Sequence, residues 1–181
     1  MDERREDVRH RMLEKVLRFV RDASRVPGVC SISRLGSITT PKANPKDVDL
    51  LVVVSDAADL APIAARGRQL EGRLQSLNHG ADIFLANESG RYLGRTCSWR
   101  ECRPGIRASC HADNCGRRPY LNDDLSSLRL SAETVAKPAA RLWPQVERRC
   151  PLPADVDACL RQLGMSPHTA FPAPDAGAGQ E

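Results

Sequence analysis

Aromatic residues and long apolar runs are scarce in this sequence. Aromatics make up only 4% of its 181 residues, so aliphatic side chains must build most of any core. No apolar run approaches the roughly 20 residues that a membrane-spanning helix needs, and no membrane partner is expected. The first ten residues, MDERREDVRH, are charged from the second onward. They do not predict a secretory signal, and we expect a cytoplasmic protein.

Lysine is scarce as well, since only four of the 27 basic residues are lysine. The formal net charge of +4 is compatible with a polyanionic partner, although richness in arginine and alanine is also typical of a GC-rich genome. The sequence contains seven cysteines. In a cytoplasmic protein they are expected to be reduced, metal-bound or buried rather than joined in disulfides.

The most informative stretch is Gly36–Val54, which reads GSITTPKANPKDVDLLVVV. Asp47 and Asp49 are separated by one residue just before an apolar run. On a strand, alternate side chains share a face, so the two carboxylates would project together. Their mutual repulsion is relieved by a cation, and oxygen ligands suit Mg²⁺ or Mn²⁺. The upstream Gly36–Ser37 turn can present backbone N–H groups to phosphate oxygens.

This arrangement resembles the signature of the DNA polymerase beta-type nucleotidyltransferase superfamily. Gly36–Ser37 is followed by nine residues, then by Asp47–Asp49 and a hydrophobic strand. The superfamily adds a third carboxylate on a later strand between apolar neighbours, and Asp82 matches that position. The resemblance covers residues 5–87. Many small members follow the Gly-Ser pair with Arg-Gly, whereas this chain has Ile38–Pro41 there.

The resemblance implies a metal-dependent nucleotidyltransferase, which transfers a nucleoside monophosphate from a nucleoside triphosphate to a hydroxyl. Asp47, Asp49 and Asp82 would be the catalytic, metal-binding carboxylates, with Glu88, Asp123 and Asp124 as other candidates for the third. Four residues would contact the triphosphate, namely Gly36, Ser37, Lys42 and Lys46. The two lysines are equally well explained as solvated loop residues. The acceptor, whether a protein, an RNA or a small molecule, is left open.

Two other functions stay open from the sequence. One is a catalytically inactive module of the same fold that binds nucleic acid or a protein. The other is an antitoxin-like role with a separately encoded partner protein, because small stand-alone members of the superfamily often modify or neutralise a toxin.

Periodicity predicts the elements of the first half of the chain. Apolar residues at helical spacing predict helices, and alternating or continuous apolar runs bounded by turn residues predict strands. The predicted order is helix 2–24, strand 29–35, strand 47–54, helix 55–80 and strand 81–86. The fold class is therefore α/β or α+β, a small mixed β-sheet with helices packed on one side of it.

A Cys/Arg-rich segment follows at residues 91–118. Cys97, Cys102, Cys110 and Cys115 are spaced by five, eight and five positions. Four thiolates bind Zn²⁺ tetrahedrally and would organise a segment that has little core of its own. Small buried or loop cysteines, or a redox-active pair, explain the same residues. Arginines beside Trp99 would bind phosphate or stack on a base, unless they form a solvated loop.

The sequence after the Cys/Arg-rich segment predicts short helices followed by a tail. Helical stretches are expected around 134–142 and 154–163. Residues 164–181 are rich in Pro, Ala and Gly and are expected to be disordered. The predicted organisation is a nucleotidyltransferase-like core at 1–90, an appendage at 91–163 and the tail.

Overall fold

Strand β2 (Asp47–Val54) is the middle strand of a seven-stranded mixed sheet with the order β5-β4-β3-β2-β1-β6-β7. The computed structural model describes residues 3–35, 45, 47–98, 120–122, 130–148 and 151–162. Strands β2 and β3 run parallel, and every other described pair is antiparallel. The remaining strands are β1 (Val29–Leu35), β3 (Gly80–Asn87), β4 (Tyr92–Thr96), β5 (Leu121–Asn122), β6 (Ala140–Trp143) and β7 (Glu147–Arg148). The predicted mixed sheet with packed helices is confirmed.

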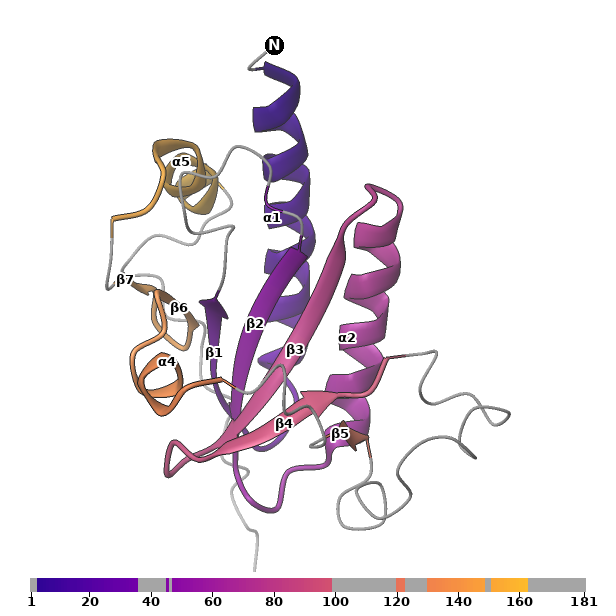
Figure 1. Ribbon diagram of the computed structural model, residues 1–181, viewed down its shortest axis with the longest axis vertical. Coiled ribbons are helices and arrows are strands. Elements are labelled where there is room, and N and C mark those ends of the chain that lie inside the picture. Colours follow the sequence, from indigo (N-terminus) through magenta and orange to yellow (C-terminus); the bar gives the residue numbers. More distant parts are fainter. Residues whose placement is uncertain are drawn as a thin grey trace, which may run out of the picture.

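Two long helices, α1 (Glu3–Ala23) and α2 (Leu60–Gln75), lie on the same face of the sheet (Figure 1). The core between them and the sheet is largely aliphatic, as the shortage of aromatics requires. From β2 it takes the alternate residues Val48, Leu50, Val52 and Val54. Arg66 Nε of α2 donates to the backbone oxygen of Asp22 at 2.8 Å and joins the two helices. A further helix on this side, α5 (Ala154–Gln162), contacts α1 through an ion pair between Arg9 and Asp155 at 3.0 Å.

Helix α2 is bounded by the signals that its sequence carries. Asp59 is its N-cap and accepts the N–H of Ala61 at 2.9 Å, which satisfies one of the unpaired donors of the first turn. Asn78 follows the helix with φ of 60°. Gly67 lets the helix approach the sheet closely, because an added Cβ would lie 3.0 Å from Cγ1 of Ile83. The helix is shorter than the predicted range 55–80.

The opposite face of the sheet carries a second, smaller apolar cluster. It consists of Leu35, Leu51, Phe84, Ala86 and Val135. Val135 belongs to the short helix α4 (Ala132–Ala136). The prediction that helices cover only one side is therefore wrong, since α4 packs on the other.

Two local predictions also differ from the structure. Strict alternation along 29–35 would put Val29 and Ile32 on opposite faces, but a bulge between Val29 and Ser31 lets both join the main core. The predicted helix 134–142 ends at Ala136, and Ala140–Trp143 forms strand β6 beside β1 instead. Pro138 lies between the two and cannot donate a helical hydrogen bond.

The sheet continues beyond residue 90. Strand β4 pairs with β3, and β6 pairs with β1, so strands from both predicted parts of the chain share one sheet. The predicted tail lies outside the described residues. No described helix has the length and apolar character needed to cross a membrane.

Candidate active site

Three carboxylates are brought to one end of the sheet by the parallel pairing of β2 with β3. In that register Asp49 is the Cα partner of Asp82, and Asp47 is the partner of Gly80. Val48, Leu50 and Ile83 enter the core under the helices. Because side chains alternate along a strand, the three aspartates project from the opposite face. The predicted juxtaposition of Asp47, Asp49 and Asp82 is thus provided by the backbone.

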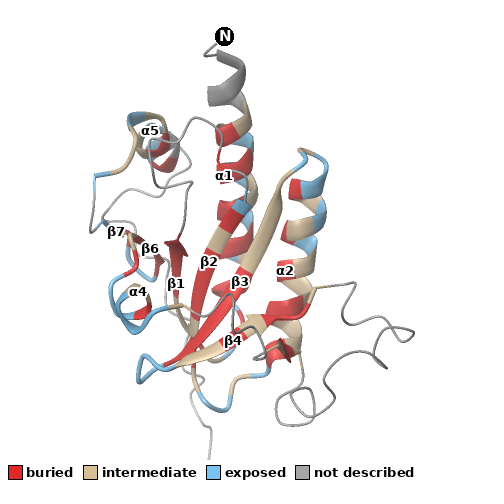
Figure 2. Ribbon diagram, viewed as in Figure 1, coloured by how far each residue is buried: buried red, intermediate tan, exposed pale blue. Residues whose placement is uncertain are grey.

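This end of the sheet is where β2 and β3 begin and where β1 ends. Leu35, the last residue of β1, is the Cα partner of Asp49. The first three residues of β3 are partly exposed and the rest are buried, as the change from tan to red in Figure 2 shows. The carboxylates therefore lie at the more accessible end of a buried strand pair. The predicted triphosphate contacts Gly36, Ser37, Lys42 and Lys46 lie outside the described residues.

The electrostatics of the site are centred on Asp49. Its pKa is raised from the ordinary 3.8 to about 6. The first cause is desolvation, since burial penalises the charged form, and the charges of Asp82 and then Asp47 add to it. A bound cation would relieve the repulsion that Asp82 and Asp47 exert on the Asp49 carboxylate.

The other two carboxylates already have partners. Asp47 Oδ1 accepts the N–H of Gly80 at 3.2 Å. Asp82 Oδ1 accepts from Nη1 of Arg95 at 3.1 Å. Arg95 comes from β4, where it is the Cα partner of Phe84. We do not predict Arg95 as a site residue from the sequence, because it falls in the Cys/Arg-rich segment. Its neighbours Gly94 and Thr96 form no apolar run that would indicate a strand.

Oxygen donors of this kind suit Mg²⁺ or Mn²⁺, so the chemistry of the three aspartates fits the predicted metal. In this structure, however, the three side chains do not converge on one point. Within the described parts of the chain, no three His, Cys, Asp or Glu side chains come together closely enough to hold a metal ion. One oxygen of Asp82 is engaged by Arg95. The strand register brings the three aspartates to one place, but their side chains would have to move to coordinate an ion together.

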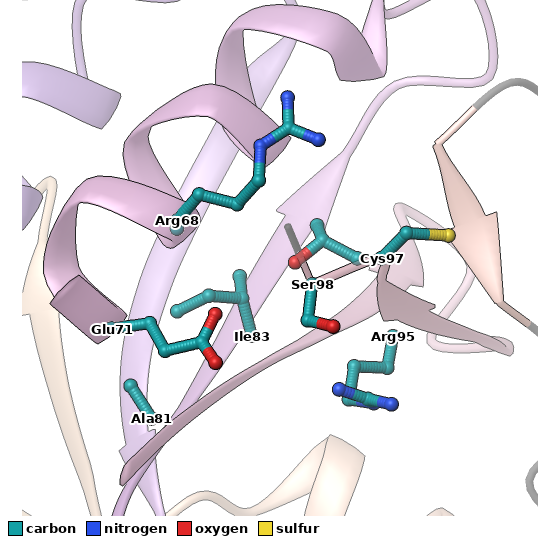
Figure 3. Close-up of a pocket in the computed structure, with 9 residues that line it drawn as sticks. Arg68, Glu71, Ala81, Ile83, Arg95, Cys97 and Ser98 are labelled. Atoms are coloured by element: carbon teal, nitrogen blue, oxygen red, sulfur yellow. The ribbon is translucent and has the colours of Figure 1, made fainter. Parts of the chain in front are cut away.

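A pocket lies on the helix-covered face of the sheet, between α2 and strands β3 and β4 (Figure 3), whereas the three aspartates project from the opposite face. It is shallow and opens to solvent, and the space in it that a water-sized sphere can occupy is only about 10 Å³. The described pairing of β3 with β4 begins at Phe84 and Arg95, and the two strands diverge from there toward the start of β3 (Figure 1). The charged side chains that line the pocket are Arg68, Glu71 and Arg95. Arg95 contributes atoms to the pocket wall, but its guanidinium pairs with Asp82 on the opposite face of the sheet.

Only one of the four predicted zinc ligands can be placed. Cys97 follows β4, is buried at 1% exposure, and donates its backbone N–H to the oxygen of Tyr120 at 3.0 Å. Its sulfur points away from the other side chains labelled in Figure 3. Cys102, Cys110 and Cys115 lie outside the described residues, as do Trp99 and its neighbouring arginines. The zinc site stays a prediction.

The other candidates for the third carboxylate give no better site. Glu88 is exposed in the turn that follows β3, at the opposite end of that strand from Asp82. Asp123 and Asp124 lie outside the described residues. Among the described candidates, Asp82 alone is in register with Asp49.

Comparisons of the chain with protein-family models, with curated proteins and with solved structures found no match.

Proposed function

We propose that the protein is a metal-dependent nucleotidyltransferase, which transfers a nucleoside monophosphate from a nucleoside triphosphate to a hydroxyl acceptor. The observation that supports this most directly is the register of β2 and β3, in which Asp49 lies beside Asp82 with Asp47 on the same face. Together with the sequence motif, this arrangement supports a site in which the three carboxylates hold a divalent cation. The strand that precedes Gly36 ends beside them, which suits a phosphate-binding turn at the same edge.

In this proposal Asp47, Asp49 and Asp82 hold Mg²⁺ or Mn²⁺. A divalent ion in such a site neutralises and orients phosphate oxygens. The chain itself contributes rigid placement of the carboxylates, because both strands are hydrogen-bonded in the middle of the sheet. Gly36, Ser37, Lys42 and Lys46 are the proposed triphosphate contacts. The acceptor is a protein hydroxyl, an RNA end or a small molecule.

The test is a thermal-shift titration with each nucleoside triphosphate, with and without Mg²⁺. A ligand that binds only the folded state raises the melting temperature by mass action. We expect a Mg²⁺-dependent rise that Asp49→Asn abolishes. Asp56→Asn is the matched control, because Asp56 is exposed and follows the far end of β2. A rise of equal size in Asp49→Asn, or no rise with any triphosphate, would overturn the proposal.

A second candidate is favoured by the ion pair between Arg95 and Asp82, which leaves the third carboxylate neutralised. In that case the chain is an inactive module that binds nucleic acid or a separately encoded protein. For nucleic acid, binding would weaken with added salt and would survive the combined Asp47→Asn and Asp49→Asn substitution. Loss of binding in that double variant would contradict this candidate.

A further inference from the structure

Arg95 makes the closest described approach of a positive charge to the three aspartates. Its Nη1 lies 3.1 Å from Oδ1 of Asp82. The side chain of Arg95 is 14% exposed and that of Asp82 is 30% exposed. Pairs that are partly shielded from water are screened less than surface pairs. The contact therefore holds Asp82 more firmly than an ordinary surface ion pair would.

The pairing of β3 with β4 places Arg95 within reach of Asp82. Arg95 is the Cα partner of Phe84, and Asp82 lies two residues before Phe84 on the same face of β3. The pair is thus a diagonal cross-strand contact, within reach of a long side chain. The aromatic side chains of Phe84 and Tyr92, whose ring centroids are 6.4 Å apart, belong to the apolar cluster on this face. Arg95 itself comes from β4, a strand that the nucleotidyltransferase motif does not include.

We propose that Arg95 competes with the divalent cation for Asp82. When no metal is bound, the guanidinium occupies the carboxylate that the cation needs, and cation binding requires the Arg95–Asp82 pair to open. This inference rests on the proposed function, because it takes Asp82 to be a metal ligand. It explains why the ligands are in register in the backbone while their side chains do not converge.

The pair is not sealed from water, because the side chain of Asp82 is 30% exposed and that of Arg95 is 14% exposed. Asp82 also lies in the partly exposed first part of β3. A guanidinium that leaves Asp82 can therefore turn toward solvent, so opening of the pair does not require burial of an unpaired charge in an apolar core.

The experiment measures Mn²⁺ affinity directly, with Mn²⁺ alone as the probe and titration calorimetry as the readout. The proteins are the wild type, Arg95→Gln, Asp82→Asn and the double variant. If the pair is closed in about 70 to 90% of metal-free molecules, removing the guanidinium tightens Mn²⁺ binding by about threefold to tenfold, because apparent affinity scales with the competent fraction. Arg91→Gln is the control, since Arg91 is exposed in the turn between β3 and β4, and it should bind like the wild type.

The double variant separates competition at Asp82 from a general loss of positive charge. Competition at Asp82 predicts that Arg95→Gln has no effect on Mn²⁺ affinity once Asp82 is already Asn. If the tightening persists in the Asp82→Asn background, competition for Asp82 is refuted. Unchanged or weaker Mn²⁺ binding by Arg95→Gln, with normal binding by the wild type, also overturns the inference and leaves the proposed function standing.

Absence of Mn²⁺ binding by both the wild type and Arg95→Gln would instead overturn the proposed metal site. Circular dichroism melts in chelator establish that each variant is folded. If Arg95→Gln does not fold, Arg95→Lys takes its place. Lysine keeps the charge but lacks the planar fork of donors, so a smaller tightening is expected, and no tightening would refute competition.

Discussion

Gly80 and Asp47 face each other across the first position of the parallel pair β2–β3. The N–H of Gly80 donates to Asp47 Oδ1 at 3.2 Å, and a Cβ added to Gly80 would lie 2.8 Å from the same oxygen. The absence of a side chain at residue 80 therefore allows the Asp47 carboxylate to occupy its position. Gly80 supports the site without contributing a ligand.

Gly80→Ala is expected to displace the Asp47 carboxylate and weaken Mn²⁺ binding by about 10- to 100-fold, as loss of groups that orient metal ligands commonly does. Titration calorimetry measures the change. Gly72→Ala is the control, because an added Cβ there meets nothing within 4 Å. That helical position should gain up to about 1 kcal/mol in the free energy of unfolding and keep its Mn²⁺ affinity. Wild-type affinity in Gly80→Ala would refute the supporting role.

Asp49 should make the folded protein less stable as the pH rises. Its pKa in the folded state is about 6, above the ordinary 3.8, so the folded chain keeps a proton that the unfolded chain has lost. The free energy of unfolding therefore falls as the pH rises from about 4 to about 6 and stays lower above that range.

Asp49→Asn removes this penalty. In chelator at pH 7 we expect the free energy of unfolding to rise by on the order of 1 to 2 kcal/mol, after a discount for solvent screening at a partly exposed side chain. At pH 4 the change should be small. Urea unfolding at both pH values checks this, with Asp56→Asn as the control. Equal effects at pH 4 and pH 7 would show that charge on Asp49 is not the cause.

Gly28 and Gly90 have similar left-handed φ values of 83° and 78° but different surroundings. A Cβ on Gly28 would lie 2.6 Å from Cβ of Ala58, whereas a Cβ on Gly90 meets nothing within 4 Å. Gly90→Ala should cost only the backbone penalty of about 1 to 2 kcal/mol. Gly28→Ala should cost about 1 to 3 kcal/mol more from overpacking. Equal costs in urea unfolding would contradict the role of crowding at residue 28.

The zinc prediction can be checked at Cys97, the one predicted ligand that the structure places. If its thiolate binds zinc with the other three cysteines, the purified protein carries one zinc per chain, and Cys97→Ser loses it. Elemental analysis by mass spectrometry gives the ratio. Cys30→Ser is the control, because Cys30 lies on β1 and its thiol donates to the Gly28 oxygen at 3.5 Å. Zinc retained in Cys97→Ser would exclude Cys97 as a ligand.

The local pattern of the sequence was enough to predict the first five elements. The apolar stripe predicts α1, and apolar residues at helical spacing predict α2, although the helix begins at Leu60 rather than at the predicted residue 55. The period of two also places Asp47 and Asp49 on one face without knowledge of any neighbour. These are short-range properties, and the structure has strands at 29–35 and 47–54 with the predicted bounds.

Only the tertiary structure decided which distant residues meet. The pairing of β3 with β2 sets Asp82 beside Asp49, and a shift of one residue would turn Asp82 into the core. Strands β4 and β6 are short, and their hydrogen-bond partners are supplied by strands elsewhere in the chain. For that reason local periodicity predicted neither the sheet beyond residue 90 nor Arg95 as the partner of Asp82. The carboxylate pattern is thus a property of the sequence, whereas the cation that faces it depends on strand pairing.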